Sequence, residues 1–166
     1  FATAPGVFAE SGRMFLLDVS GDLNQTVGNR SAAEILKTSC TQAIERFYPS
    51  EVIGLRVFAG RDSASGTLLI PPKANSTRAF HDAVQAIRPH GERFSLFRAI
   101  QVGIEDLDSF SNSELIVSTA GELDPEPNSA ELVRLLKEKQ IRLHAYAIGN
   151  KSSFAWLGEL ALEAGG

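Results

Sequence analysis

The chain has 166 residues, of which 43% are hydrophobic and 22% charged, with a formal net charge of −4 at pH 7. These values are typical of one soluble globular domain, here residues 1–166, with a core of its own. The longest apolar runs are too short to span a bilayer, and the mild acidity argues against a nucleic-acid partner, which normally requires a basic face.

The first predicted element is a strand at RMFLLDVS, residues 13–20. A near-continuous apolar run of this kind is typical of a strand buried on both faces of a sheet. Asp18, Ser20 and Asp22 lie at the end of this run and in the turn that follows. They are candidate oxygen ligands for a metal ion, or turn residues whose side chains bond to backbone amides.

A helix is predicted from Ala32 to Phe47, because Ser31 and Glu34 form the capping-box pattern S-x-x-E at its start. Cys40, the only cysteine, lies within this helix. A single cysteine excludes an intrachain disulfide and a cysteine-rich zinc site. We expect Cys40 to be a buried thiol rather than a reactive one.

The remaining pattern alternates strands and helices. In chain order, the expected elements are strands 52–59 and 66–72, helices 76–87 and 96–107, strand 114–119, helix 129–140, strand 141–149 and helix 153–164. The link between the strands 52–59 and 66–72 is too short for a crossover, so this pair should be antiparallel.

This alternation predicts an α/β fold, a doubly wound three-layer α/β/α arrangement whose sheet is mostly parallel with one antiparallel edge strand. Ligands bind such sheets at the carboxyl ends of the strands, near the point where the strand order reverses. The turn after the first strand is expected there. The residues expected to be buried are Phe15, Leu16, Leu17, Ile53, Leu55, Val57, Ile116, Val117, Ala145 and Ala147.

Several motifs resemble those of von Willebrand factor type A (vWA) domains. DVSGD resembles the family's D-x-S-x-S loop, LRVFAG its second strand, FSLFRAIQVGIEDL its T-x-L-x-x-A-L helix start, ELIVSTAGEL its fourth strand with the T-D-G turn, and LHAYAIGN its fifth strand. The resemblance covers nearly the whole chain and implies a Rossmann-like vWA fold. LGELALEAGG is similar to the helix before a sixth strand, so we expect that last strand to be missing and the chain to be a fragment of a larger, multidomain protein.

The family's metal-ion-dependent adhesion site (MIDAS) surrounds magnesium with an aspartate, two serines, a threonine and a second aspartate, and a carboxylate of the partner completes the coordination. Asp18 and Ser20 match the first two positions, and Asp22 takes the second serine position. Phe94 stands at the threonine position and Ala120 at the second aspartate position. Two of the five oxygen groups are therefore replaced.

Magnesium requires near-octahedral oxygen ligation, and each lost anionic ligand weakens its binding. We therefore expect a degenerate MIDAS with no cofactor, in which the three turn residues bind Mg²⁺ or Ca²⁺ weakly at most. The alternative is a magnesium-dependent adhesion domain that uses the same three residues. In that case Ser95 replaces the threonine by a register shift, or Glu122 or Asp124 supplies an oxygen.

Enzyme motifs are incomplete. LLDVSGDL loosely resembles the D-x-D-x-T motif of haloacid-dehalogenase-like phosphatases, but Ser20 stands where the second acid is needed and cannot act as a general acid. No G-x-S-x-G nucleophile motif accompanies the three histidines, His81, His90 and His144. We expect no catalytic residues.

The expected function is therefore that of a non-enzymatic, adhesion-type module that binds a partner protein through the loops at the carboxyl ends of the strands. The acidic, proline-containing stretch GELDPEPNSAE, residues 121–131, belongs to this rim. The predicted rim residues are Asn24, Arg30, Arg93, Phe94, Glu122 and Asp124. The resemblance also favours an extracytoplasmic or secreted protein.

Overall fold

The computed structural model describes residues 10–59, 66–91, 95–121, 129–151 and 154–166. Its sheet has the strand order β5-β4-β1-β6-β7. The strands are β1 (Gly12–Asp18), β4 (Val52–Phe58), β5 (Thr67–Lys73), β6 (Ser113–Thr119) and β7 (Ile141–Ala147). All neighbours pair in parallel except β4 and β5, which are antiparallel. The predicted hairpin and the mostly parallel sheet are therefore confirmed.

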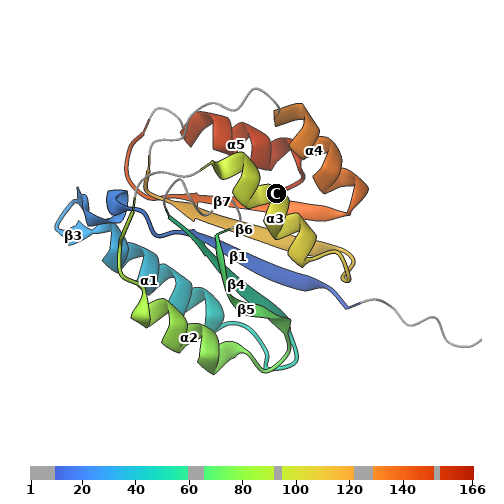
Figure 1. The fold of residues 1–166 in the computed structure, drawn as a ribbon, viewed down its shortest axis with the longest axis horizontal. Helices are drawn as coiled ribbons and strands as arrows, with labels where there is room; N and C mark the ends of the chain where they lie inside the picture. Colours follow the sequence, from blue (N-terminus) through green and yellow to red (C-terminus); the bar gives the residue numbers. More distant parts are fainter. Residues whose placement is uncertain (1–9, 60–65, 92–94, 122–128, 152–153) are drawn as a thin grey trace, which may run out of the picture.

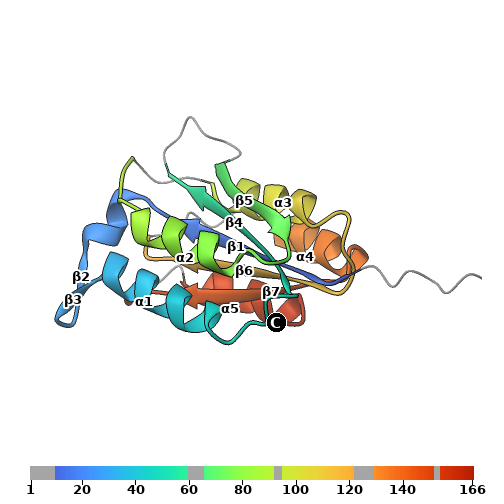
Figure 2. The same cartoon turned by 90° about the horizontal axis from the view of Figure 1, so that it is seen from below.

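The helices form a layer on each side of the sheet (Figures 1 and 2). Helices α1 (Ala32–Ile44) and α2 (Thr77–Ala86) lie on one face, and α3 (Leu96–Asp106), α4 (Ser129–Glu138) and α5 (Phe154–Glu163) lie on the other. This confirms the three-layer α/β/α arrangement. None of the helices in the described ranges is long and apolar enough to cross a membrane.

The segment between β1 and α1 contains three small elements that the sequence pattern did not predict. They are a 3-10 helix, η1 (Gly21–Asn24), and the two-residue strands β2 (Thr26–Val27) and β3 (Arg30–Ser31). The capping box that follows is confirmed, because the Ser31 hydroxyl accepts a bond from the Glu34 N–H and the Glu34 carboxylate accepts one from the Ser31 N–H. The helix ends at Ile44, earlier than the predicted Phe47.

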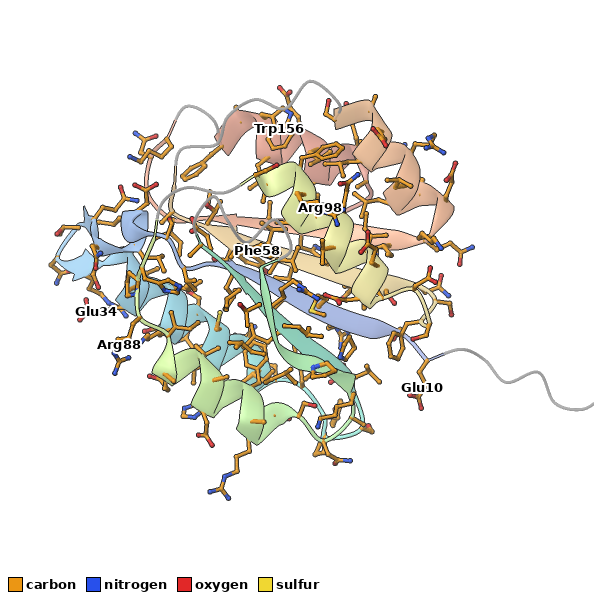
Figure 3. The ribbon with its side chains drawn as sticks, in the orientation of Figure 1. Glu10, Glu34, Phe58, Arg88, Arg98 and Trp156 are labelled. Atoms are coloured by element: carbon orange, nitrogen blue, oxygen red, sulfur yellow. The ribbon has the colours of Figure 1, made fainter. Side chains whose placement is uncertain are left out.

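Successive residues of β1 enter different cores. Met14 and Leu16 pack with the α3–α5 layer, whereas Phe15 and Leu17 pack with α1 and α2. In Figure 3, Phe58 of β4 lies beneath α3, in the first of these cores. A strand that is buried on both faces accounts for the near-continuous apolar run in the sequence.

Most of the predicted buried positions are buried or half-buried. Phe15, Leu16, Leu17, Ile53, Leu55 and Val117 are buried, and Val57, Ile116 and Ala145 are half-buried. The prediction for Ala147 is wrong, because this residue is exposed. Ala147 is the last residue of β7, which lies at the edge of the sheet and has a neighbouring strand on one side only.

An ion pair inside the α3 layer was not predicted. Arg56 of β4 donates from Nε and Nη2 to the two carboxylate oxygens of Asp106 at the end of α3, each at 2.7 Å. The two side chains are only 9% and 11% exposed. The pair therefore fastens α3 to a central strand from within the protein.

We predict that Asp106→Ala lowers the free energy of unfolding by about 3–5 kcal/mol, because it leaves the guanidinium of Arg56 buried without its carboxylate. Urea denaturation measures this change. The control is Arg134→Ala, which breaks the exposed Arg134–Glu138 pair and should cost less than about 1 kcal/mol. Equal, small losses for the two variants would contradict the structural role given to Arg56 and Asp106.

Candidate functional site

The candidate site lies where the strand order reverses. From β1 the chain continues to β4 and β5 on one side of the sheet and later to β6 and β7 on the other. The registers of β1 and β6 pair Leu16 with Val117 and Leu17 with Ser118. Asp18 and Thr119 come next along their strands and therefore end side by side. Open α/β sheets bind ligands in this crevice.

The carboxylate of Asp18 joins the two turns that follow β1 and β6. Asp18 is 2% exposed. Its Oδ1 accepts a hydrogen bond from the Ser20 N–H at 2.8 Å, and its Oδ2 accepts bonds from the Thr119 hydroxyl at 2.8 Å and the Ala120 N–H at 3.4 Å. Both carboxylate oxygens are therefore engaged by donors of the chain itself.

Other hydrogen bonds hold the neighbouring loops in place. Gln25 Nε2 donates to the Ala120 carbonyl at 2.5 Å, which is a second link between the turns after β1 and β6. The His90 N–H donates to the Val19 carbonyl at 2.9 Å, and the Gly21 N–H donates to the Gly91 carbonyl at 3.2 Å. The turn after β1 is thus bonded to loops on both of its sides.

Ser20 and Asp22 lie close to Asp18, as the sequence predicted. Ser20 is 2% exposed, and within the described part of the chain its hydroxyl has no hydrogen-bond partner. Asp22 is half-buried. A Cβ atom on Gly121 would lie 2.8 Å from Asp22 Oδ2 and 3.3 Å from Asp18 Oδ2. Both carboxylates therefore lie beside Gly121, and a larger residue at this position would require the Asp22 side chain to shift.

These groups do not fit a tight magnesium site. The oxygens of Asp18 already accept three internal hydrogen bonds, and Ala120, fully buried, brings no oxygen at the second aspartate position. Among the described residues, no cluster of three or more His, Cys, Asp or Glu side chains is placed to hold a metal ion. Ser20 and Asp22 alone supply too few fixed ligands for an octahedral ion.

The structure describes two of the six predicted rim residues. Asn24 and Arg30 are exposed, and Arg30 Nη2 donates to the Glu34 carbonyl and to the Thr38 hydroxyl. The other predicted rim residues, Arg93, Phe94, Glu122 and Asp124, lie outside the described residues.

In the structure, Ser95 caps a helix. It is the N-cap of α3, and its hydroxyl accepts a bond from the Arg98 N–H at 3.3 Å. This cap explains the serine without the register shift that a replacement of the missing threonine requires.

Among the described residues, the Cys40 thiol and the three imidazoles form no hydrogen bond or ion pair with one another. Cys40 is buried, as the sequence predicted, and this burial raises the pKa of its thiol to about 12. The three imidazoles have separate neighbours: His81 lies 3.4 Å from Asp82, His90 lies 2.9 Å from the Arg88 carbonyl, and His144 lies 3.9 Å from Glu114.

Thr119 and Gln25 are site residues that sequence reasoning missed. Each contacts a residue about a hundred positions away, so no local pattern reveals the pair. Thr119 does carry one signal, because it is the polar end of the apolar strand ELIVST and stands next to the T-D-G-like turn.

Neither protein-family models nor curated proteins match this sequence. Solved structures do match in fold. A von Willebrand factor type A protein from Catenulispora acidiphila superposes with a TM-score of 0.69 at 15% identity, covering 94% of this chain and 37% of that one. Manganese-loaded TRAP protein of Plasmodium vivax gives 0.64 at 17% identity, covering 92% and 63%.

A third match is proximal thread matrix protein 1 from the mussel byssus, with a zinc-occupied MIDAS motif, at a TM-score of 0.63 and 16% identity, covering 94% of this chain and 45% of that one. The chain thus spans less than two thirds of the length of each of these three proteins. Because these identities are low, the likeness establishes the arrangement of sheet and helices alone.

We predict that Asp18→Ala lowers the free energy of unfolding by about 2–4 kcal/mol, because it leaves the Thr119 hydroxyl and the Ser20 N–H buried without an acceptor. Urea denaturation of Asp18→Ala, Thr119→Val and the double variant measures the coupling between the two side chains. The double variant should be less destabilised than the sum of the two single ones. Strict additivity would show that the Asp18–Thr119 bond does not link the turns.

We predict the opposite behaviour for Ser20→Ala. Its hydroxyl is buried and makes no bond to the described residues, so its removal should leave the free energy of unfolding unchanged or raise it by up to about 1 kcal/mol. The same urea titration measures it, with Ser31→Ala, which removes the α1 cap and should cost about 1 kcal/mol, as a serine control. A loss above that of Ser31→Ala would reveal a structural bond of Ser20.

Proposed function

We propose that this chain, which has the fold of von Willebrand factor type A domains, is a non-enzymatic module that binds a partner protein through its carboxyl-end rim without a tightly held metal ion. Domains of this fold generally mediate protein–protein interaction or adhesion. The observation that carries the proposal is the Asp18 carboxylate, whose two oxygens are engaged by Ser20, Thr119 and Ala120.

The shape and exposure of the rim support the proposed contact surface. Figure 1 shows η1, β2 and β3 projecting at the end of the sheet where β1 finishes. Asn24 and Arg30 are exposed on this projection. The hydrogen bonds from Gln25 to Ala120 and from Gly21 to Gly91 fix its base. A preformed surface loses little conformational entropy on binding, which favours affinity.

The absence of two MIDAS oxygens supports a direct mode of binding. In the family's metal site a carboxylate of the partner completes the coordination of the ion. Where Ala120 replaces the second aspartate, a partner gains less from such a carboxylate, which would also face Asp18 and Asp22 at short range. Side chains of the rim loops then supply the affinity and the specificity.

A magnesium-dependent adhesion domain that uses Asp18, Ser20 and Asp22 is the second candidate. One observation favours it, the buried Ser20 hydroxyl, which has no bonding partner within the described ranges. Buried polar atoms are usually satisfied, so a weakly held ion or a water molecule is a natural neighbour for this oxygen. A phosphatase is less well supported, because Ser20 stands at the position of the second acid.

We also make a proposal about the parent protein and its compartment. We place it within a longer, multidomain protein outside the cytoplasm. The matched structures support the first part, since this chain covers 37%, 45% and 63% of their lengths.

We predict that Asn24→Arg and Arg30→Ala each reduce the capture of a partner protein by about tenfold, since both change the exposed rim. The matched control is Arg78→Ala, at the start of α2, whose side chain is 96% exposed. Quantitative mass spectrometry of proteins captured from an extract of the source cells gives the comparison. A captured protein counts as a partner only if its yield falls with both rim variants and stays unchanged with Arg78→Ala.

The same capture is repeated with EDTA and with added magnesium. We expect equal yields of the accepted partner under the two conditions. Loss of that partner in EDTA, restored by magnesium, would support the magnesium-dependent candidate instead. If no protein distinguishes the rim variants from Arg78→Ala, the rim is not the binding surface.

A further inference from the structure

An open groove with a volume of about 540 Å³ lies between α1 and α2 on the outer side of these helices. The described side chains that line it are all polar, and they include Arg30, Lys37 and Gln85. The segment after α2 joins this surface to the rim, because the His90 N–H donates to the Val19 carbonyl in the turn after β1 at 2.9 Å. The groove therefore borders on the proposed contact surface, and its lining suits a polar or charged occupant.

Two positive side chains meet where α2 ends. Lys37 Nζ donates to the Gln85 carbonyl at 2.9 Å, and Arg88 Nη1 donates to the same oxygen at 3.2 Å. Arg88 Nη1 also donates to the Ile87 carbonyl at 3.0 Å. The carbonyl oxygens at a helix C-terminus attract cations, which explains why two like charges lie together here. Lysine has three N–H donors and arginine five, so both groups retain donors for a further acceptor.

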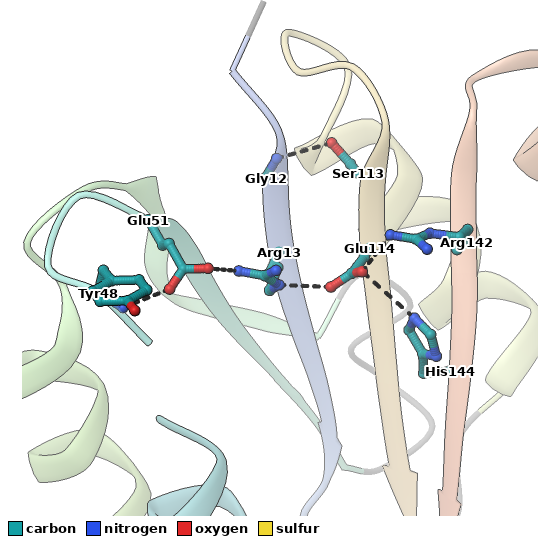
Figure 4. Close-up of polar contacts among 8 residues, drawn as sticks. All are labelled: Gly12, Arg13, Tyr48, Glu51, Ser113, Glu114, Arg142 and His144. Carbon is teal, nitrogen blue, oxygen red and sulfur yellow. Dashed lines mark hydrogen bonds and ion pairs between the residues drawn. The ribbon is translucent and has the colours of Figure 1, made fainter. Parts of the chain in front are cut away.

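These two charges lack the partners that other basic side chains have. Figure 4 shows a paired case, in which Arg13 and Arg142 both donate to the Glu114 carboxylate at 2.6 Å. Neither Lys37 nor Arg88 forms an ion pair with any residue that the structure describes. Burial and the charge of Arg88 lower the pKa of Lys37. An anion bound between the two groups would relieve this repulsion.

The groove is positive at its rim end only. Arg30 adds a third cation there, and Figure 3 shows Glu34 and Arg88 at this same end of the helical layer. The Glu34 carboxylate accepts a bond from the Ser31 N–H, which holds the pKa of Glu34 below its ordinary value. Three cations against this one carboxylate leave the rim end positive. Glu45, at the opposite end of α1, makes the far end of the groove negative.

This pattern of charge favours a protein segment over a uniformly charged polymer. A sulfated polysaccharide repeats its anionic groups along the chain and would meet Glu34 and Glu45 as well as the cations. A peptide can place its carboxylates at the rim end alone. Because the whole chain has a net charge of −4, attraction of an acidic partner depends on this local cluster and not on the overall charge.

We propose that the groove binds an acidic segment of the partner protein, with one Asp or Glu carboxylate bridging Lys37 and Arg88. This inference rests on the function proposed above and adds the chemistry of the partner. The Lys37 and Arg88 nitrogens that share the Gln85 carbonyl lie close enough for one carboxylate to accept a charge-assisted bond from each. The cations of the chain itself then hold a carboxylate of the partner without a metal ion.

The probe for this proposal is a dye-labelled peptide in which Glu and Ser residues alternate, and fluorescence anisotropy measures its binding. The control peptide has Gln in place of each Glu. We expect saturable binding of the acidic peptide, which weakens as added salt screens the charges, and no binding of the control peptide.

Paired substitutions locate the binding site. Lys37→Gln combined with Arg88→Gln should weaken the affinity for the acidic peptide by about tenfold, or about 1.4 kcal/mol for the two contacts together. The matched control combines Arg134→Gln with Lys137→Gln, which removes two exposed charges from α4 on the other side of the sheet. This control should change the affinity by less than about twofold.

Reversal of the charges separates recognition from a structural effect. Lys37→Glu combined with Arg88→Glu should abolish binding of the acidic peptide. The same variant should bind a peptide of alternating Lys and Ser more tightly than the wild-type chain does. Urea midpoints verify that each variant is folded.

Equal weakening by the two glutamine pairs would show attraction by overall charge and would overturn the proposal. So would a sulfated oligosaccharide that binds this groove more tightly than a peptide of the same net charge. The capture experiment keeps the two proposals apart. A partner that is lost with the rim variants but captured fully by the Lys37→Gln and Arg88→Gln variant would support the rim and contradict the groove. Specific peptide binding in the groove, when no captured protein distinguishes the rim variants, would support the groove and contradict the rim.

Discussion

The hydrogen bonds of one carboxylate hold together the end of the sheet where the two halves of the chain meet. The parallel pairing of β1 and β6 stops at Leu17 and Ser118. Asp18 replaces the missing backbone bonds by accepting from Ser20, Thr119 and Ala120. The rim loops, including the η1–β3 projection, are held by this junction together with the hydrogen bonds from Gln25 to Ala120 and from Gly21 to Gly91.

The same junction is the reason why we propose binding without a tightly held metal ion. An aspartate carboxylate has about four lone-pair positions, and the three internal donors occupy most of them. The neighbouring position, Ala120, adds no oxygen, and a side chain at Gly121 would press against the carboxylates of Asp18 and Asp22. An arrangement that favours internal bonding in this way fixes the loops without an ion, which is why we propose that exposed residues such as Asn24 and Arg30 recognise the partner.

Local patterns in the sequence predicted local features well. The apolar run at 13–19, the Ser31–Glu34 capping box and the short link between β4 and β5 each act within a few residues, and the grouping of Asp18, Ser20 and Asp22 follows from one turn. Long-range pairs could not be predicted in this way. Arg56 bonds to Asp106, which is fifty positions away in the sequence, and Asp18 bonds to Thr119, which is 101 positions away. The exposure of Ala147 follows from the place of β7 at the edge of the described sheet, which only the assembled topology reveals.

Titration calorimetry with magnesium, manganese and calcium tests the central claim most directly, because it measures ion binding without knowledge of the partner. The account predicts no binding tighter than the millimolar range for any of the three ions, and the same result for the wild-type chain and for Ser20→Ala. A micromolar site that Ser20→Ala removes would contradict it, and would show that the turn after β1 holds a working metal site despite Ala120.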